Sequence, residues 1–110
     1  MAKILVIITS KDHDRILPGL MWSINALKYR WVEDLEVIFF GSSELLIADD
    51  DPLVMDSIKK LRAAGKEPIA CRRIAENSKI LEKLEGKVRV EYVGKLIGEK
   101  ISEGYAPMTF

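Results

Sequence analysis

The sequence is poor in the two side chains that most often carry metal and redox chemistry, with one cysteine, Cys71, and one histidine, His13. A single cysteine cannot form an internal disulfide, which favours a cytoplasmic protein over a secreted one. One histidine and one cysteine cannot build a His/Cys metal cluster, so we expect no metal site. His13 has no clear partner for a catalytic triad and is expected to be a solvated residue just before a helix.

Long apolar runs and an excess of charge of one sign are also missing. The longest apolar run near the N-terminus, residues 4–8, is too short for a signal sequence or a membrane span. Lys+Arg and Asp+Glu both total 17, which gives no support to nucleic acid or an anionic membrane as a partner. With 110 residues and 48% hydrophobic content, the chain is expected to form one soluble cytoplasmic domain, residues 1–110.

Glycine is absent where nucleotide binding would need it. A phosphate loop requires GxxxxGK[ST], and a dinucleotide site requires GxGxxG, directly after the first strand. This chain has TSKDHD there, so ATP, GTP and NAD are not expected, and no cofactor is predicted. The acidic run 49–51 lacks further ligands at calcium-loop spacing and is interpreted as a solvated run whose last residue caps a helix.

Short apolar runs alternate with helical periods along the chain, which predicts βαβ units. The expected strands are residues 3–8, 35–40, 67–71, 87–93 and 105–110. The expected helices are residues 14–31, a short turn within 42–48, a helix capped by Asp51 with Pro52 first and Gly65 as its stop, then 72–86 and 94–104. The fold class predicted is three-layer α/β/α with a mostly parallel five-stranded sheet.

Two faces of the first helix are predicted from its periodicity. The face toward the sheet is expected to carry Leu17, Leu20, Met21, Ile24, Leu27 and Trp31. The opposite face would carry Trp22, Ala26 and Tyr29, an aromatic stripe that indicates a contact surface and self-association. The alternative is that a loop of the same chain covers this stripe.

Ligands of parallel sheets bind beyond the carboxyl ends of the strands. That rule selects three loops, Thr9-Ser10-Lys11, Gly41-Ser42-Ser43 and Cys71-Arg72-Arg73. A thiolate at Cys71 would be favoured by the start of the next helix and by the two arginines. No neighbouring His or carboxylate is evident as a base, and Asn77 stands where an oxyanion loop would need Arg. The alternative is a buried cysteine that acts as a small hydrophobic residue.

The order of these segments resembles the DsrE/DsrF-like (TusD-like) family of small sulfur-relay proteins over essentially the whole chain. The resemblance rests on the strand "AKILVIITS", the helix "DRILPGLMWSINAL", the cysteine after "GKEPIA", and the last strand "GYAPMTF". It implies a three-layer fold, a homo-oligomer such as a trimer or hexamer, and a persulfide on Cys71 passed between donor and acceptor proteins. Only Cys71 carries over as a matched catalytic position.

These observations support three hypotheses. The first is a sulfur carrier or sulfurtransferase-like protein with the persulfide on Cys71, an anionic donor held by Arg72 and Arg73, and a pocket lined by Thr9, Ser10, Gly41 and Ser42. The second is a non-catalytic oligomeric binding or assembly subunit with a structural cysteine. The third is a small-molecule-binding or nucleotide-binding flavodoxin-like domain, against which the missing phosphate loop argues.

Overall fold

The protein forms one five-stranded parallel sheet with helices on both faces, seen in a computed structural model that describes all residues 1–110. The strands are β1 (Lys3–Ile8), β2 (Asp34–Phe39), β3 (Ile69–Cys71), β4 (Arg89–Glu91) and β5 (Ala106–Thr109). Their order is β4-β3-β2-β1-β5, and each neighbouring pair is parallel. The predicted α/β class is confirmed. Pro107 lies on the edge strand β5, where a missing N–H removes no bond that the sheet needs.

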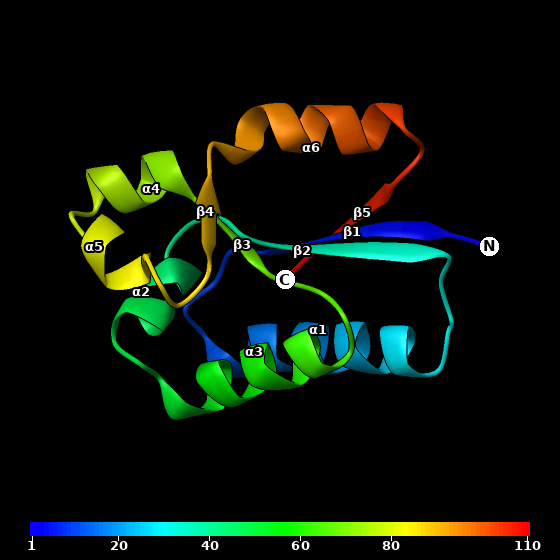
Figure 1. The fold of residues 1–110 in the computed structure, drawn as a ribbon, viewed down its shortest axis with the longest axis horizontal. Helices are drawn as coiled ribbons and strands as arrows, with labels where there is room; N and C mark the ends of the chain where they lie inside the picture. The colour runs from blue at the N-terminus through cyan, green and yellow to red at the C-terminus, as the bar shows by residue number, and fades with distance from the viewer.

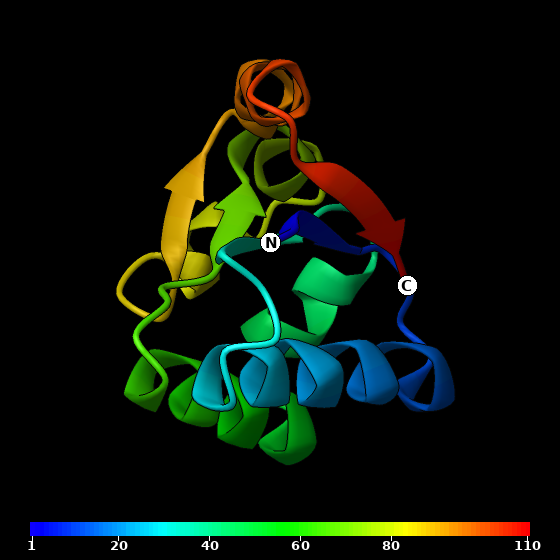
Figure 2. The same ribbon diagram turned by 90° about the vertical axis from the view of Figure 1, so that its right-hand side faces the viewer.

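The helices form two layers and a cluster at one end of the sheet (Figures 1 and 2). They are α1 (His13–Lys28), α2 (Ser43–Ala48), α3 (Pro52–Ala63), α4 (Arg72–Asn77), α5 (Leu81–Leu84) and α6 (Val93–Ser102). Helices α1 and α3 lie side by side below one face, and α6 lies above the other. The short helices α2, α4 and α5 gather at the carboxyl ends of the strands. None of the helices has the length and apolar character that a membrane crossing requires.

The direction of the chain explains the two layers. From β1 to β4 each strand is placed on the same side of the previous one, whereas β5 returns to the far side of β1. Crossovers between parallel strands are right-handed, so a reversal of direction moves the connecting helix to the opposite face. Helix α6 makes this returning connection and therefore covers the face that α1 and α3 leave open.

Each face of the sheet has its own apolar core. Ile4, Val6 and Ile8 of β1 belong to a cluster of 20 buried residues on the α1 and α3 side. Leu5 belongs to a cluster of 6 buried residues on the α6 side. Because both faces are covered, β1 needs apolar side chains in both directions, which accounts for its unbroken apolar run.

The predicted sheet-facing stripe of α1 is wrong in part. The buried residues of this helix are Ile16, Gly19, Leu20, Ser23 and Ala26, while Met21 and Trp31 are 60% and 52% exposed. The buried face differs from the predicted one because it contains the small residues Gly19, Ser23 and Ala26. These residues let α1 approach the sheet closely, but they contribute little to an apolar pattern in the sequence. Ser23 can be buried because its hydroxyl donates to the Gly19 carbonyl at 2.7 Å.

The predicted aromatic stripe on the opposite face of α1 is also wrong in part. Ala26 is fully buried, and Trp22 is partly buried against the larger core cluster. Tyr29 is 58% exposed and stacks on Trp31, with ring centroids 5.9 Å apart. The exposed apolar surface of α1 is therefore centred on Met21, one residue away from the predicted stripe.

The segment predicted as one helix over residues 72–86 forms two helices. Lys79 has a φ of +59°, and the Ile80 N–H bonds to the Ala75 carbonyl at 3.0 Å. This six-to-one bond with a left-handed residue before it is the pattern that ends helices. The break turns Ile80 into the buried core, which a continuous helix would not do.

The start and end of α3 match the prediction. Oδ2 of Asp51 accepts a hydrogen bond from the Val54 N–H at 3.1 Å, and Pro52 takes the first helical position. Gly65 follows the helix with a φ of +100°, a conformation that residues with a Cβ rarely adopt. The local sequence therefore determines both ends of this helix.

Candidate functional site

The three loops selected from the sequence meet at the carboxyl edge of the sheet, because they follow the adjacent strands β1, β2 and β3. The Ser43 N–H donates to the Thr9 carbonyl at 3.1 Å, which joins the first two loops. Gly41 lies against the same loop, and a Cβ added there would stand 3.2 Å from the Thr9 oxygen. This close approach and the φ of +127° at residue 41 together favour glycine there.

The polar groups of these loops bond mainly within the chain. The Thr9 hydroxyl and N–H both donate to the Phe110 oxygen, at 2.9 and 2.7 Å. The Ser42 hydroxyl donates to the Thr9 carbonyl at 3.2 Å, and the Ser10 hydroxyl accepts from the Asp12 N–H at 2.9 Å. Thr9, Ser10 and Ser42 therefore stabilise the loops, and each would exchange an internal bond to contact a ligand.

Cys71 is the last residue of β3 and is only 4% exposed. Its neighbours are the apolar residues of the smaller core cluster, including Leu5, Ile38 and Val93. The side chain is thus packed between the sheet and α6, away from solvent. This environment is the one in which a free cysteine acts as a small hydrophobic residue.

Arg72 and Arg73 are directed at a tyrosine on the next strand end. Their guanidinium groups lie 5.8 and 5.6 Å from the centroid of the Tyr92 ring. Both also approach Glu76, at 3.5 and 3.7 Å, and the Tyr92 hydroxyl donates to the same carboxylate at 3.1 Å. The two guanidinium groups share one carboxylate, so one positive charge remains unbalanced in this group.

The strand order places this group at a topological switch point. The connection after β3 packs Ala75 and Leu84 into the larger cluster on the α1 and α3 side, although Ile74 of α4 packs against the smaller cluster. The connection after β4 is α6, which lies wholly on the other side (Figure 1). Adjacent strands whose connections leave in opposite directions open a crevice at their carboxyl ends. Cys71 and Glu91 are register partners at this place. The switch point therefore falls between Cys71 and Tyr92.

Glu44, which was not singled out from the sequence, is the most unusual residue of this edge. It lies in the first turn of α2 and has no exposed surface. Oε2 accepts a hydrogen bond from the Gly41 N–H at 3.3 Å, whereas Oε1 has no partner that meets ordinary hydrogen-bond geometry. Burial raises the pKa of Glu44 to about 7, although the N–H groups of Gly41 and Cys71 act in the lowering direction. This carboxyl thus changes charge near neutral pH beside the cysteine.

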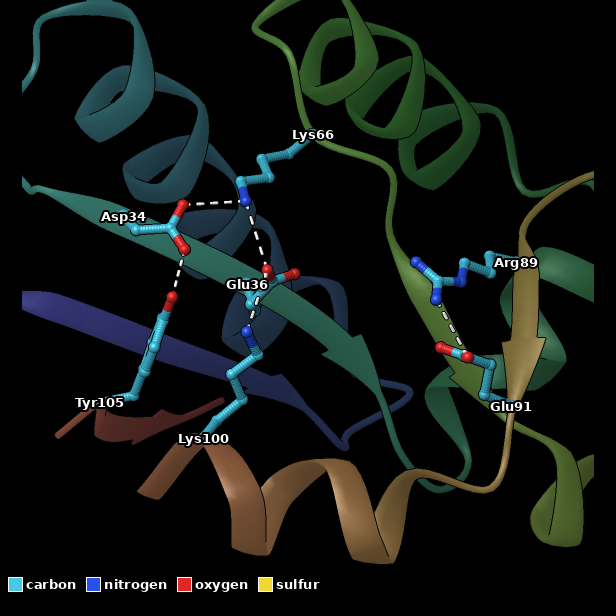
Figure 3. Close-up of polar contacts among 7 residues, drawn as sticks. All are labelled: Asp34, Glu36, Lys66, Arg89, Glu91, Lys100 and Tyr105. Carbon is cyan, nitrogen blue, oxygen red and sulfur yellow. Dashed lines mark hydrogen bonds and ion pairs between the residues drawn. The ribbon is translucent and has the colours of Figure 1, made fainter. Parts of the chain in front are cut away.

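A second polar cluster lies at the opposite end of β2, between that strand and α6 (Figure 3). Lys66 pairs with Asp34 at 2.8 Å and with Glu36 at 3.3 Å, and Lys100 approaches Glu36 at 3.8 Å. Tyr105 donates its hydroxyl hydrogen to Asp34. These acidic and basic groups neutralise one another, which explains how partly buried charges are tolerated beneath the helix.

The hydrogen bonds of this cluster alter its pKa values. Burial raises the pKa of Asp34, but the hydrogen bonds from Lys66 and Tyr105 outweigh it, so the pKa lies below its usual value. The pKa of Tyr105 is raised, first by the hydrogen bond to Asp34 and then by burial. At neutral pH both shifts favour an ionised Asp34 that accepts a hydrogen bond from a neutral Tyr105. The cluster is therefore structural in character.

The start of α1 and the start of α3 are joined by one carboxylate. Nε2 of His13 lies 2.9 Å from Oδ2 of Asp51, the oxygen that also caps α3. His13 is the first residue of α1 and is partly exposed, so the prediction of a residue just before a helix is displaced by one position. Its contact with Asp51 was not predicted, because the helix pairing that creates it is tertiary.

Comparison with solved structures identifies the same fold in two other proteins. A conserved protein of unknown function from Bacteroides thetaiotaomicron superposes with a TM-score of 0.87 and 22% identity, over 98% of this chain and 94% of that one. A protein of unknown function from Methanobacterium thermoautotrophicum superposes with a TM-score of 0.75 and 18% identity, over 100% of both chains. No protein-family model and no curated protein matches the chain. These likenesses show the fold alone.

Proposed function

We propose that this protein is a non-catalytic oligomeric binding or assembly subunit of DsrE/DsrF-like fold, in which Cys71 is a packing residue. The observation that carries the proposal is the 4% exposure of Cys71 within an apolar cluster. The arginines that follow it contact Tyr92 and Glu76 instead of facing the sulfur. A single thiol kept apolar and buried suits a protein of the reducing cytoplasm.

The test is the rate at which iodoacetamide alkylates Cys71 in the folded protein, measured by intact mass. We expect slow modification under native conditions and fast modification in denaturant. The variant I101C on a C71A background provides the matched control, because residue 101 is 49% exposed on α6. Alkylation of native Cys71 at the rate of this control would contradict a packing role.

A second candidate, a sulfur carrier with a persulfide on Cys71, is favoured by Glu44. A fully buried carboxyl with an unpaired oxygen lowers stability, and such groups concentrate at functional sites. Its carboxyl lies near the backbone N–H of Cys71, so this candidate assigns to Glu44 the role of proton acceptor, for which the sequence offered no residue. Arg72 and Arg73, with one unbalanced positive charge, would hold an anionic donor at the switch point.

In this second candidate, the transfer of sulfur to Cys71 needs no external oxidant. Glu44 carboxylate takes the proton of the Cys71 thiol, and the thiolate attacks the outer sulfur of a donor persulfide. A new S–S bond forms on Cys71, the donor S–S bond breaks, and the donor leaves as a thiolate. Donor and acceptor proteins would be the partners. Thr9, Ser10, Gly41 and Ser42 would border the site.

Incubation with a persulfide or thiosulfate donor, followed by intact mass, separates the two candidates. The carrier predicts a gain of one sulfur atom in the wild type, no gain in C71S and slower gain in E44Q with a changed pH profile. The assembly subunit predicts no gain in any of the three. An unmodified wild type after exposure to both donors would exclude the carrier.

A further inference from the structure

The outer surface of α1 and α3 carries a groove that runs along both helices. A hollow of about 570 Å³ between the first turns continues into one of about 710 Å³ near the helix ends. The two hollows share Ile24, Asn25 and Lys60, so they form one depression. The residues that line this α1–α3 groove come from the two helices that lie side by side below the sheet in Figure 1, and they include the exposed Met21 and Leu53.

The α1–α3 groove is bordered by the largest exposed apolar side chains of these two helices. Met21 on α1 is 60% exposed, and Leu53 on α3 is 53% exposed. Leu17, Pro18 and Ile24 of α1 also line the first hollow. Contiguous apolar surface of this kind, flanked by charges, marks an interaction site more often than bare solvent.

Charge is distributed unevenly along the α1–α3 groove. Asp14 lies at the end where both helices begin, and Lys28 and Arg30 lie at the end where α1 stops. None of these three residues forms an ion pair within the chain, whereas Asp56 and Lys60 pair with each other at 2.9 Å. Each end of the groove thus offers an unpaired charge, and the two ends are opposite in sign.

The unpaired charges are symmetric about Met21. Asp14 and Lys28 are each seven residues from it, so the three side chains share one face of α1. The span from Asp14 to Lys28 is about 21 Å at the rise of an α-helix. Consider the α1 helix of a second copy packed antiparallel on this face, with a two-fold axis at Met21. Asp14 of each copy would then lie opposite Lys28 of the other copy.

We propose that the α1–α3 groove is a two-fold interface that binds α1 of a second copy of this chain, with Met21 at the axis. The proposal rests on the assembly role and identifies its contact surface. Antiparallel packing also opposes the dipoles of α1 in the two copies. The same patch serves both subunits, as a two-fold contact requires. Such a contact fits a dimer or a hexamer built from dimers and not a cyclic trimer.

The first experiment is the molar mass of the wild type, M21E and the control I101E by light scattering and sedimentation. Ile101 is 49% exposed on α6, on the other face of the sheet, so I101E adds the same charge elsewhere. We expect M21E to weaken association by about 100-fold or more, because two carboxylates would meet at the axis. I101E should match the wild type.

Charge reversal tests the antiparallel register. D14K and K28D should each associate about tenfold or more weakly, because each places like charges opposite one another. An equimolar mixture of D14K and K28D should associate again, since the mixed pair restores both complementary contacts. The double variant D14K/K28D should also recover. Circular dichroism of each variant checks that α1 still folds.

The outcomes separate this inference from the proposed function. A monomeric wild type overturns both. A wild-type oligomer that M21E and the charge reversals leave intact overturns the α1–α3 interface but not the assembly role. As a measurement independent of affinity, M21C on a C71A background should form a disulfide-linked dimer on mild oxidation, and I101C should not. Equal cross-linking of both variants overturns the two-fold axis at Met21.

Discussion

The carboxyl group of Glu44 accepts a hydrogen bond from the Gly41 N–H at 3.3 Å while having no exposed surface. Ionising this carboxyl is costly, because the buried charge is stabilised only by a long hydrogen bond from the Gly41 N–H and by the nearby Cys71 N–H. This residue gives the fold an unusual dependence on pH.

Burial raises the pKa of Glu44 from 4.5 to about 7, so the folded state binds a proton more tightly than the unfolded state. The free energy of unfolding therefore falls as pH rises between about 4.5 and 7, by an amount on the order of 3 kcal/mol. Denaturant titrations at pH 5 and pH 8 measure this difference. In E44Q, whose side chain is neutral at every pH, the free energy of unfolding should fall much less between pH 5 and pH 8. An equal decline in E44Q would show that another group causes it.

Asp51 stabilises two helices with one oxygen, because Oδ2 caps α3 and also contacts His13. We expect D51A to lower the free energy of unfolding by about 1–2 kcal/mol, the usual cost of a lost N-terminal cap. D51N retains a capping oxygen and should lose less. The matched control is D49A, because the exposed Asp49 side chain makes no hydrogen bond or ion pair and its φ of −86° suits alanine. Thermal melts that rank D51N as equal to D51A would argue against the cap as the main contribution.

Gly19 is adjacent to the ring of Phe110, and a Cβ added at residue 19 would stand 2.5 Å from that ring. G19A should therefore destabilise the protein by about 1–3 kcal/mol through overpacking, despite the better helix propensity of alanine. F110A should remove the clash. A double-mutant cycle measures the coupling, and additive effects of G19A and F110A would contradict direct contact.

Tyr105 donates to Asp34 in the charged cluster of Figure 3. Y105F removes this donor and leaves Lys66 as the remaining side-chain partner of Asp34. A hydrogen bond to a charged group contributes about 1.5–3 kcal/mol, and the partial exposure of Asp34 places Y105F at the lower end. The variant should also bring the pKa of Asp34 nearer to its usual value. NMR titration of the Asp34 carboxyl measures this, and an unmoved pKa would count against the bond.

The sequence alone determined the local structure wherever one segment contains its own signals. The apolar run of β1, the Asp51-Pro52 start of α3 and its Gly65 stop follow from short-range preferences, and the α/β class follows from their alternation. The thiol at the end of β3 was also placed correctly, since Cys71 ends that strand. These features depend on residues that are neighbours in the chain.

Tertiary structure decided the rest, because burial depends on which elements meet. The strand order placed the switch point between Cys71 and Tyr92, a pair 21 residues apart that no local pattern joins. Glu44 sits in a segment that reads as a loop with a short turn, and it becomes buried only where the ends of β2 and β3 enclose it. The sheet-facing side of α1 was displaced for the same reason, since Gly19 accommodates Phe110 from the far end of the chain.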